Sequence, residues 1–225
     1  MQKKFIEDIA EFLPLSSHKI LLIGETCEDI YHFGRTSKKE RFVDTRFNAH
    51  VLRVDRNDKV EPISFEEKNI DLDQFDAVVI SDYNKGFVSS RFCKEITTKF
   101  KGPVFVDTKK DNLNCFKNCI LKINEEESRK ISNLSSGCEL ITTLGKSGAK
   151  YREKIFPAFE AGVFDVCGAG DVFLASLAAC FLNIRKMPTS IMFANLCSSI
   201  SVKTMGNHCV TYKEILNSLD SLGKQ

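Results

Sequence analysis

The chain has 225 residues, of which 43% are hydrophobic and 28% are charged. This composition is typical of a globular domain and excludes a collagen-like, coiled-coil or disordered chain. With 32 Lys and Arg against 30 Asp and Glu, the net charge of +2 is too close to balance to indicate a nucleic-acid or anionic-lipid partner. No stretch reaches the ~20 apolar residues of a membrane span, and acidic residues interrupt the apolar start of the chain, so we expect a cytoplasmic protein.

Nine cysteines are scattered along the chain, several of them inside apolar runs where a thiol packs as a small hydrophobic group. A zinc site needs two pairs of closely spaced ligands. Cys115 and Cys119 form one such spacing, but no second pair accompanies them. We therefore expect reduced thiols and no zinc.

A short amphipathic helix is expected at the start, where residues 3–13 place apolar side chains on one face before Pro14. Five short apolar runs, each followed by polar residues or glycine, then predict buried strands. These runs are residues 19–24, 77–81, 104–106, 119–121 and 140–143.

Stretches of helical length and mixed polarity accompany these strands, at residues 88–101, 125–134, 169–183, 188–203 and 212–222. The alternation predicts an α/β fold with a mostly parallel sheet, in which ligands bind at the carboxyl ends of the strands. Polar residues and a glycine follow the predicted strands and should gather along that edge: Asp29, Ser81, Asp82, Asp107, Asn124 and Gly145.

One region breaks the alternation, between residues 31 and 60. It is charged and irregular, but residues 48–55 have the Val and Leu content of an exposed strand. We interpret this region as a reduced β lid over the site edge, within a single domain that spans residues 1–225.

The strongest local signal is the segment DVCGAGD at residues 165–171, which is followed by an apolar helical stretch. Gly168 and Gly170 allow a tight turn where the helix begins, so unpaired N–H groups and the positive end of the helix dipole face one spot that suits an anion. Asp171 falls in the first turn, where a carboxylate also simply stabilises a helix.

This segment resembles the carboxyl-terminal signature of the ribokinase-like (PfkB) carbohydrate kinases. Other segments resemble the same family in the same order, and two of them resemble its heptose-phosphate kinase branch in particular: GETCEDIYHFGR at residues 24–35 and ISDYNKG at residues 80–86. Further matching segments are VDTK at 106–109, NEEE at 124–127, TLGKSG at 143–148, FANLCSSI at 193–200 and MGNHCVT at 205–211. The resemblance implies a ribokinase-like α/β fold.

The resemblance also implies catalytic roles at the glycine-rich segment. Asp171 would be the base that takes the proton of the sugar hydroxyl. The backbone amides of Gly168, Ala169 and Gly170 would form the anion hole for the transferring phosphoryl group. Positioned donors and a carboxylate near the acceptor hydroxyl are what phosphoryl transfer requires.

By the same resemblance, Asn124 and Glu127 would organise Mg²⁺ and its water around the phosphates of ATP. Taken alone, these residues are only an N-capped acidic helix start. The residues implied to bind the nucleotide are Asn124, Glu127, Thr143, Gly145, Gly148 and Asn195, although Gly145 alone is merely a turn.

Asp29, Lys85 and Arg35 would face a sugar or sugar phosphate. A lysine before a glycine is usually just solvated, and Asp29 is also suited to cap a turn. These three assignments therefore depend on the resemblance.

The sequence departs from the family in its acceptor half. Members carry a long stretch with a Gly-Gly-x-x-x-Asn motif that binds the sugar, whereas this chain runs from Arg35 almost directly into the segment that resembles the later lid strand. In addition, Glu25 replaces the usual Asp, and Val166 and Cys167 replace the usual hydroxyl pair. Nucleotide binding is therefore better supported than any sugar specificity.

Three hypotheses follow. The first is an ATP- and magnesium-dependent kinase for a sugar or sugar phosphate, with a heptose phosphate as the best single choice. The second is a degenerate kinase that binds nucleotide or a protein partner without turnover. The third, a dinucleotide-binding oxidoreductase, is weak because the turn after the first strand is not Gly-x-Gly-x-x-Gly. Since an uncovered strand edge tends to pair with another, we also expect a homodimer through the lid.

Overall fold

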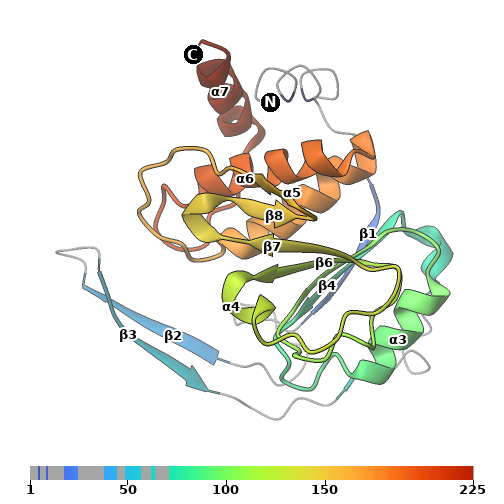
Figure 1. Cartoon of the computed structure of the whole chain (residues 1–225). Coiled ribbons are helices and arrows are strands. Elements are labelled where there is room, and N and C mark those ends of the chain that lie inside the picture. Colours follow the sequence, from blue (N-terminus) through green and yellow to red (C-terminus); the bar gives the residue numbers. More distant parts are fainter. Residues whose placement is uncertain are drawn as a thin grey trace.

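A mostly parallel sheet of seven strands forms the centre of the computed structural model, in the order β1-β4-β5-β6-β7-β8-β9 (Figure 1). The structure describes residues 18–24, 38–44, 49–56, 62–63 and 71–224, together with Phe5 and Ile9. The strands of the sheet are β1 (Ile20–Gly24), β4 (Ala77–Asp82), β5 (Val104–Thr108), β6 (Ile120–Asn124), β7 (Glu139–Thr143), β8 (Ala149–Tyr151) and β9 (Lys154–Phe156).

The first five of these strands are parallel, and they confirm the five strands expected from the apolar runs. The runs in β4, β5 and β6 are buried because a parallel sheet is covered on both faces. The burial expected for residues 19–24 is wrong, because β1 is at the edge of the sheet and leaves Ile20 and Leu22 exposed. The hairpin of β8 and β9, which adds two antiparallel strands beside β7, was not predicted. Its strands of three residues each are too short to show an apolar pattern.

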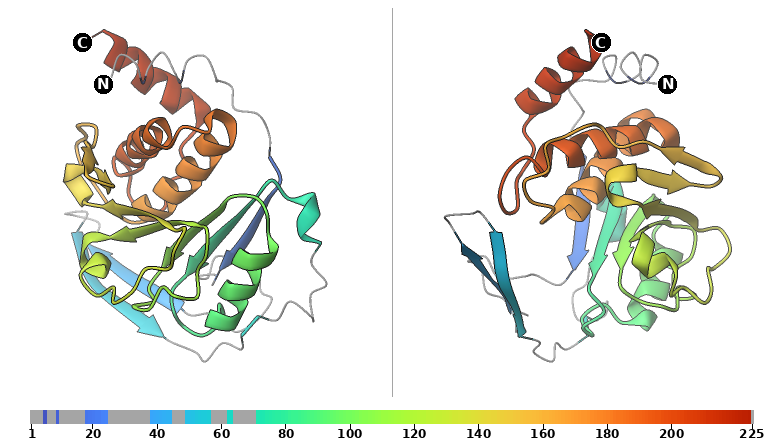
Figure 2. Two further views of the ribbon diagram at one scale, coloured as in Figure 1. Left: turned by 45° about the vertical axis from the view of Figure 1, so that its right-hand side comes forward. Right: turned by 60° about the vertical axis from the view of Figure 1, so that its left-hand side comes forward.

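Helices lie on both faces of the sheet (Figure 2). Consecutive residues of β4 belong to opposite halves of the core. Val78 and Ile80 of β4 pack with the apolar face of α3 (Ser90–Lys99), whereas Val79 packs with α5 (Ala169–Ile184) and α6 (Met187–Ser201). The period of two residues in a strand places successive side chains on opposite faces, so each strand contributes to both halves of the core.

The helices agree with the sequence at four of the predicted places, which are α3, α5, α6 and α7 (Tyr212–Gly223). The helix expected at residues 125–134 is wrong in length, because α4 spans only Glu125–Ser128. The chain then leaves the helix to make long-range contacts: the Ser132 amide donates to the carbonyl of Asp111, and Asn133 pairs with Asn112. A short 3₁₀ turn, η1 (Leu72–Gln74), precedes β4, and another, η2 (Gly145–Ser147), follows β7.

The lid region contains an antiparallel hairpin of β2 (Lys38–Asp44) and β3 (Ala49–Arg56), which confirms the strand expected at residues 48–55. A bulge shifts the register between Phe42 and Val43. The hairpin forms a sheet of its own and lies apart from the main sheet in both views of Figure 2. That this hairpin acts as a lid, and that residues 1–225 form one domain, stay predictions.

Phe5 and Ile9 are the described residues of the helix predicted at the start of the chain, and both are helical and buried. The ring of Phe5 contacts that of Phe159, with centroids 5.8 Å apart. Eight of the nine cysteines lie in the described part of the chain, and all eight are free thiols as expected. Among the described helices, none is long and apolar enough to span a bilayer.

Candidate active site

The carboxyl ends of the parallel strands bring polar residues together, as the sequence predicted. In the register of the sheet, Ser81 of β4 pairs with Asp107 of β5, and Asp107 pairs with Lys122 of β6. Asn124, at the end of β6, pairs with Thr143 of β7. Four neighbouring strands therefore present side chains along one edge.

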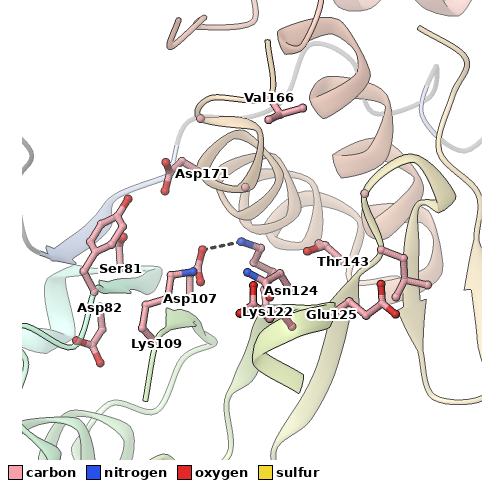
Figure 3. A pocket seen from close by; sticks show the side chains of 16 residues that line it. Ser81, Asp82, Asp107, Lys109, Lys122, Asn124, Glu125, Thr143, Val166 and Asp171 are labelled. Carbon is pink, nitrogen blue, oxygen red and sulfur yellow. Dashed lines mark hydrogen bonds and ion pairs between the residues drawn. The ribbon is translucent and has the colours of Figure 1, made fainter. Parts of the chain in front are cut away.

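A cavity of about 610 Å³ opens at this edge, and Figure 3 shows the side chains that line it. Its lining combines the ends of β4 to β7 with the first turn of α5. The residues that line it include Ser81, Asp82, Asp107, Lys109, Lys122, Asn124, Glu125, Glu126, Thr143, Gly145, Gly168, Gly170 and Asp171.

The predicted anion hole and base lie on this cavity. Gly168 is the residue before α5 and has a left-handed backbone, with φ of 75°. No side chain caps this helix start, which is the kind of position that suits an anion, although the Ala169 amide donates to the Val166 carbonyl at 3.3 Å. Asp171 is in the first turn of the helix, and Ala169 and Gly170 form the turn between them. The structure brings these four predicted residues together.

Both glycines lie close to polar side chains. A methyl group at Gly168 would lie 2.7 Å from the Oδ1 atom of Asn207, and one at Gly170 would lie 2.8 Å from the Nζ atom of Lys122. Any larger residue at Gly168 would also be strained by the positive φ. The glycines therefore let the polypeptide backbone and two polar side chains share one small space.

Asn124 and Glu127 form a capping box at the start of α4. The Asn124 side chain accepts from the Glu127 amide at 2.8 Å, and the Oε2 atom of Glu127 accepts from the Asn124 amide at 2.8 Å. The other carboxylate oxygen of Glu127 is bound by the ammonium of Lys109. Asn124 lines the cavity, whereas both oxygens of Glu127 are already engaged beside it.

A second cavity, of about 900 Å³, adjoins the first and lies between the β7–η2 turn and helices α5 and α6. Its wall contains Thr143, Gly145, Gly148 and Asn195, which are four of the residues expected to bind a nucleotide. The Gly145 position is open, since a methyl group there would meet no atom within 4 Å. The backbone turn at Gly145 therefore leaves room for a ligand.

Asn195 and Gly148 also have structural roles in this wall. The Asn195 side chain donates to the carbonyls of Phe156 and Pro157, at 2.9 and 3.0 Å. Gly148 has φ of 95°, and a methyl group there would lie 2.0 Å from the Phe156 carbonyl oxygen. These contacts fix the chain after β9 against α6 and so shape the cavity.

The predicted substrate residues are less well placed. Lys85 lies in the loop after β4 with its Nζ atom buried, and it is not among the residues that line the smaller cavity. Asp29 and Arg35 lie outside the described residues. Their assignments to a sugar phosphate stay predictions.

Three lysines at the site were missed by the sequence analysis. Lys122 is bound to Asp107, Lys109 to Glu127, and Lys110 to the buried Asp82 at 2.7 Å. A lysine inside a buried strand needs a charged or polar partner. The position of Lys122 next to an apolar run therefore indicated a buried ion pair. The sequence did not reveal the partners, because each pair joins different segments of the fold.

The model of the pfkB family carbohydrate kinases matches residues 27–210. The chain belongs to this family.

Among curated proteins, the chain is similar to the bifunctional protein HldE of a Nitratiruptor species, with 28% identity over 80% of this chain and 44% of that protein. It is 32% identical to the bifunctional protein HldE of Campylobacter jejuni, over 75% of this chain and 43% of that protein. The chain therefore spans less than half the length of these relatives.

Solved structures share the fold. Ribokinase from Thermotoga maritima superposes with a TM-score of 0.65 at 18% identity, over 97% of this chain and 85% of that chain. Phosphofructokinase-2 from Escherichia coli gives a TM-score of 0.66 at 12% identity, over 98% of this chain and 86% of that one. Arabidopsis thaliana ribokinase, solved with ribose and ATP, gives a TM-score of 0.65 at 17% identity, over 95% of this chain and 86% of that chain. The fold is therefore ribokinase-like, as expected.

Proposed function

We propose that this chain transfers the terminal phosphoryl group of ATP to a hydroxyl of a sugar or sugar phosphate. The observation that carries the proposal is the placement of Asp171 beside the uncapped start of α5, on the cavity that also receives the strand ends. A general base and an anion hole on one cavity are the two parts of phosphoryl transfer that a protein itself supplies.

In this proposal each part of the site has a distinct role. Asp171 accepts the proton of the acceptor hydroxyl while the oxygen of that hydroxyl attacks the terminal phosphorus of ATP. The amides of residues 168–170 hold the equatorial oxygens, whose charge grows in the transition state. The larger cavity beside Gly145 holds the nucleoside of ATP, because its wall is mostly apolar and suits a base and a ribose.

Magnesium fits this cavity as an ion carried by the nucleotide. Mg²⁺ binds through one or two carboxylates and phosphate oxygens and keeps several waters, and it neutralises phosphate charge. Glu125 and Glu126 line the cavity beside Asn124. Within the described part of the chain no cluster of three or more His, Cys, Asp or Glu is arranged to hold a metal by itself. Asn124 and Glu127 would then hold the ion beside the phosphates, where it would neutralise their charge.

A heptose phosphate is the acceptor we propose. The segment ISDYNKG at residues 80–86 resembles the heptose-phosphate kinase branch. The curated relatives named HldE add support, although the chain spans less than half of their length.

One observation favours the alternative of a kinase that binds nucleotide without turnover. The sequence lacks the segment that carries the sugar-binding motif in the family, and β1, the strand that precedes the gap, is an edge strand whose Leu22 is 70% exposed. An acceptor half built with fewer elements has fewer groups to orient a sugar.

The test is a screen of the purified protein with ATP, magnesium and a panel of sugars and sugar phosphates, read by the mass shift of the acceptor. We expect a phosphorylated product from at least one sugar phosphate, absent when Asp171→Asn replaces the wild type. A product from any acceptor excludes the binding-only alternative. If ATP binds but no acceptor is phosphorylated, the alternative is the correct function.

A further inference from the structure

Lys122 carries a buried positive charge directly against the anion hole. Its side chain is only 5% exposed, and its Nζ atom lies 2.6 Å from the Oδ2 atom of Asp107. A methyl group at position 170 would lie 2.8 Å from the same Nζ atom, so Lys122 reaches the backbone of the first turn of α5. Figure 3 shows the Lys122 and Asp107 side chains pointing toward one another in the cavity, with Asp171 on the neighbouring helix turn.

Stability alone is a weak reason for this ion pair. Removing two charges from water is so costly that apolar residues of similar size often stabilise a fold as well or better. The pair is also incomplete, because the Oδ1 atom of Asp107 is buried without a hydrogen-bond partner in the described structure. A buried polar group that lacks a partner calls for an explanation, and a missing ligand is one.

The donors of Lys122 point to an anion. An ammonium group has three N–H donors, and the Asp107 carboxylate accepts one of them. Lys109 and Lys110, two other lysines near this edge in the described part of the chain, are held by Glu127 and Asp82. Of these three lysines, Lys122 is the one placed to share the space in front of Gly170 with a phosphoryl group.

We propose that Lys122 is a further catalytic residue, which donates hydrogen bonds to the oxygens of the phosphoryl group under transfer while Asp107 holds its ammonium in place. The inference rests on the proposed function and deepens it. In the step, a bond forms between the acceptor oxygen and the terminal phosphorus, and the bond from that phosphorus to the bridging oxygen breaks. ADP leaves with the electron pair, and the acceptor proton goes to Asp171. Lys122 keeps its own protons throughout.

The first measurement compares nucleotides. Lys122→Met keeps the length of the side chain but removes the charge, so it should weaken the binding of Mg-ATP about tenfold, the loss expected for a charge-assisted hydrogen bond. Mg-ADP lacks the terminal phosphoryl group and should bind as it does to the wild type. Titration calorimetry measures both. The control is Lys150→Met, at an exposed position of β8.

The second measurement is turnover with the best acceptor from the screen. Removing one preorganised donor from a transition state lowers kcat by about 10²–10³-fold, which is the loss we expect for Lys122→Met. Lys122→Met leaves the carboxylate of Asp107 buried without its ammonium partner. Both measurements are therefore repeated on the double variant Lys122→Met with Asp107→Asn, in which neither side chain is charged. The melting temperature of each variant without ligand checks that it is folded.

The two proposals fail in different ways. If the wild type phosphorylates no acceptor, the proposed function is wrong, but the comparison of ATP with ADP still tests Lys122. If folded Lys122→Met loses equal affinity for Mg-ATP and Mg-ADP, or loses affinity for neither, Lys122 only supports the fold. A selective loss for ATP establishes its contact with the terminal phosphoryl group.

Discussion

The amide of Gly206 donates a hydrogen bond of 2.9 Å to the carboxylate of Asp165, across 41 residues of sequence. The other oxygen of Asp165 accepts from the amide of Cys167 at 3.0 Å, and the Asp165 side chain is buried. Asp165 therefore joins the turn after α6 to the loop that leads into the anion hole. It is the first residue of the glycine-rich segment, and its role here is to shape that segment.

Asp165→Asn should destabilise the protein and weaken the binding of Mg-ATP together. The asparagine oxygen can accept one of the two amides, but its NH₂ group cannot accept the other. A buried N–H group left without an acceptor costs about 1–3 kcal/mol in the free energy of unfolding, which urea denaturation measures. Asp220→Asn, at an exposed position of α7, is the control and should leave both quantities unchanged.

The site could be predicted in part from the sequence, because its elements are local. The strands end at polar residues, so Asp107 and Asn124 could be assigned to one sheet edge, and the glycine-rich segment precedes an apolar helix, so Asp171 could be assigned to a helix start that suits an anion. The ion pair of Lys122 could not be assigned, since Asp107 is 15 residues away and becomes its neighbour only in the register of β5 and β6.

The errors in the fold also have physical causes. The capping box of Asn124 starts a helix, but the chain beyond Ser128 is held by backbone contacts to residues 111–112, which override local helix propensity. The hairpin of β8 and β9 turns at Arg152, which adopts a left-handed φ of 54° without being a glycine. A sequence pattern gives no warning of that turn.

Asp171→Asn tests the proposed base. The amide cannot take the proton of the acceptor hydroxyl, so turnover should fall by about 10²–10⁴-fold, the usual contribution of a general base. Mg-ATP should bind almost as before, because the anion hole is made of backbone amides. Steady-state kinetics and calorimetry measure the two quantities, and Asp220→Asn again serves as the control. Unchanged turnover would remove Asp171 from the mechanism.

The thiol of Cys138 should react unusually fast at neutral pH. Its sulfur lies 3.6 Å from that of Cys119, and the hydrogen bond between the two thiols, with smaller contributions from backbone groups, lowers the pKa of Cys138 to about 6 even though burial raises it. The thiolate is the nucleophile, so the rate of alkylation by iodoacetamide should rise with pH through about 6 and level off above it.

Cys119→Ala provides the matched test of this hydrogen bond. Without the donor, the pKa of Cys138 should return toward its ordinary value, and alkylation at pH 7 should slow about tenfold or more. Mass spectrometry of the digested protein resolves the cysteines separately, and the exposed Cys209 normalises the reagent. The same rate in both proteins would mean that the Cys119 thiol does not stabilise the thiolate.

The lid hairpin should pair with the hairpin of a second copy. Both of its strands present an unpaired edge, since β2 and β3 bond only to each other within the described structure. Light scattering at micromolar concentration should give the mass of two chains, and Val51→Lys should shift it toward one chain. Ile155→Lys, at an exposed position of β9, is the control. A monomeric and fully active wild type would eliminate the lid dimer.

The acceptor half of the site should distinguish a sugar phosphate from the free sugar. Any ligand that binds only the folded protein raises its melting temperature by mass action. Because hydrogen bonds between a cation and a phosphate are the stronger kind, a heptose phosphate should raise the melting temperature more than the free heptose does. Lys85→Ala should abolish this difference, whereas Lys94→Ala, at an exposed position of α3, should preserve it.

Lys109 lines the cavity, so Lys109→Ala tests whether this lysine, rather than Lys85, binds the phosphate of the sugar. Loss of the difference in Lys109→Ala alone would move the phosphate site from the loop after β4 to the end of β5. Equal responses of the wild type to both sugars would count against a sugar-phosphate kinase and favour the protein that binds nucleotide without turnover.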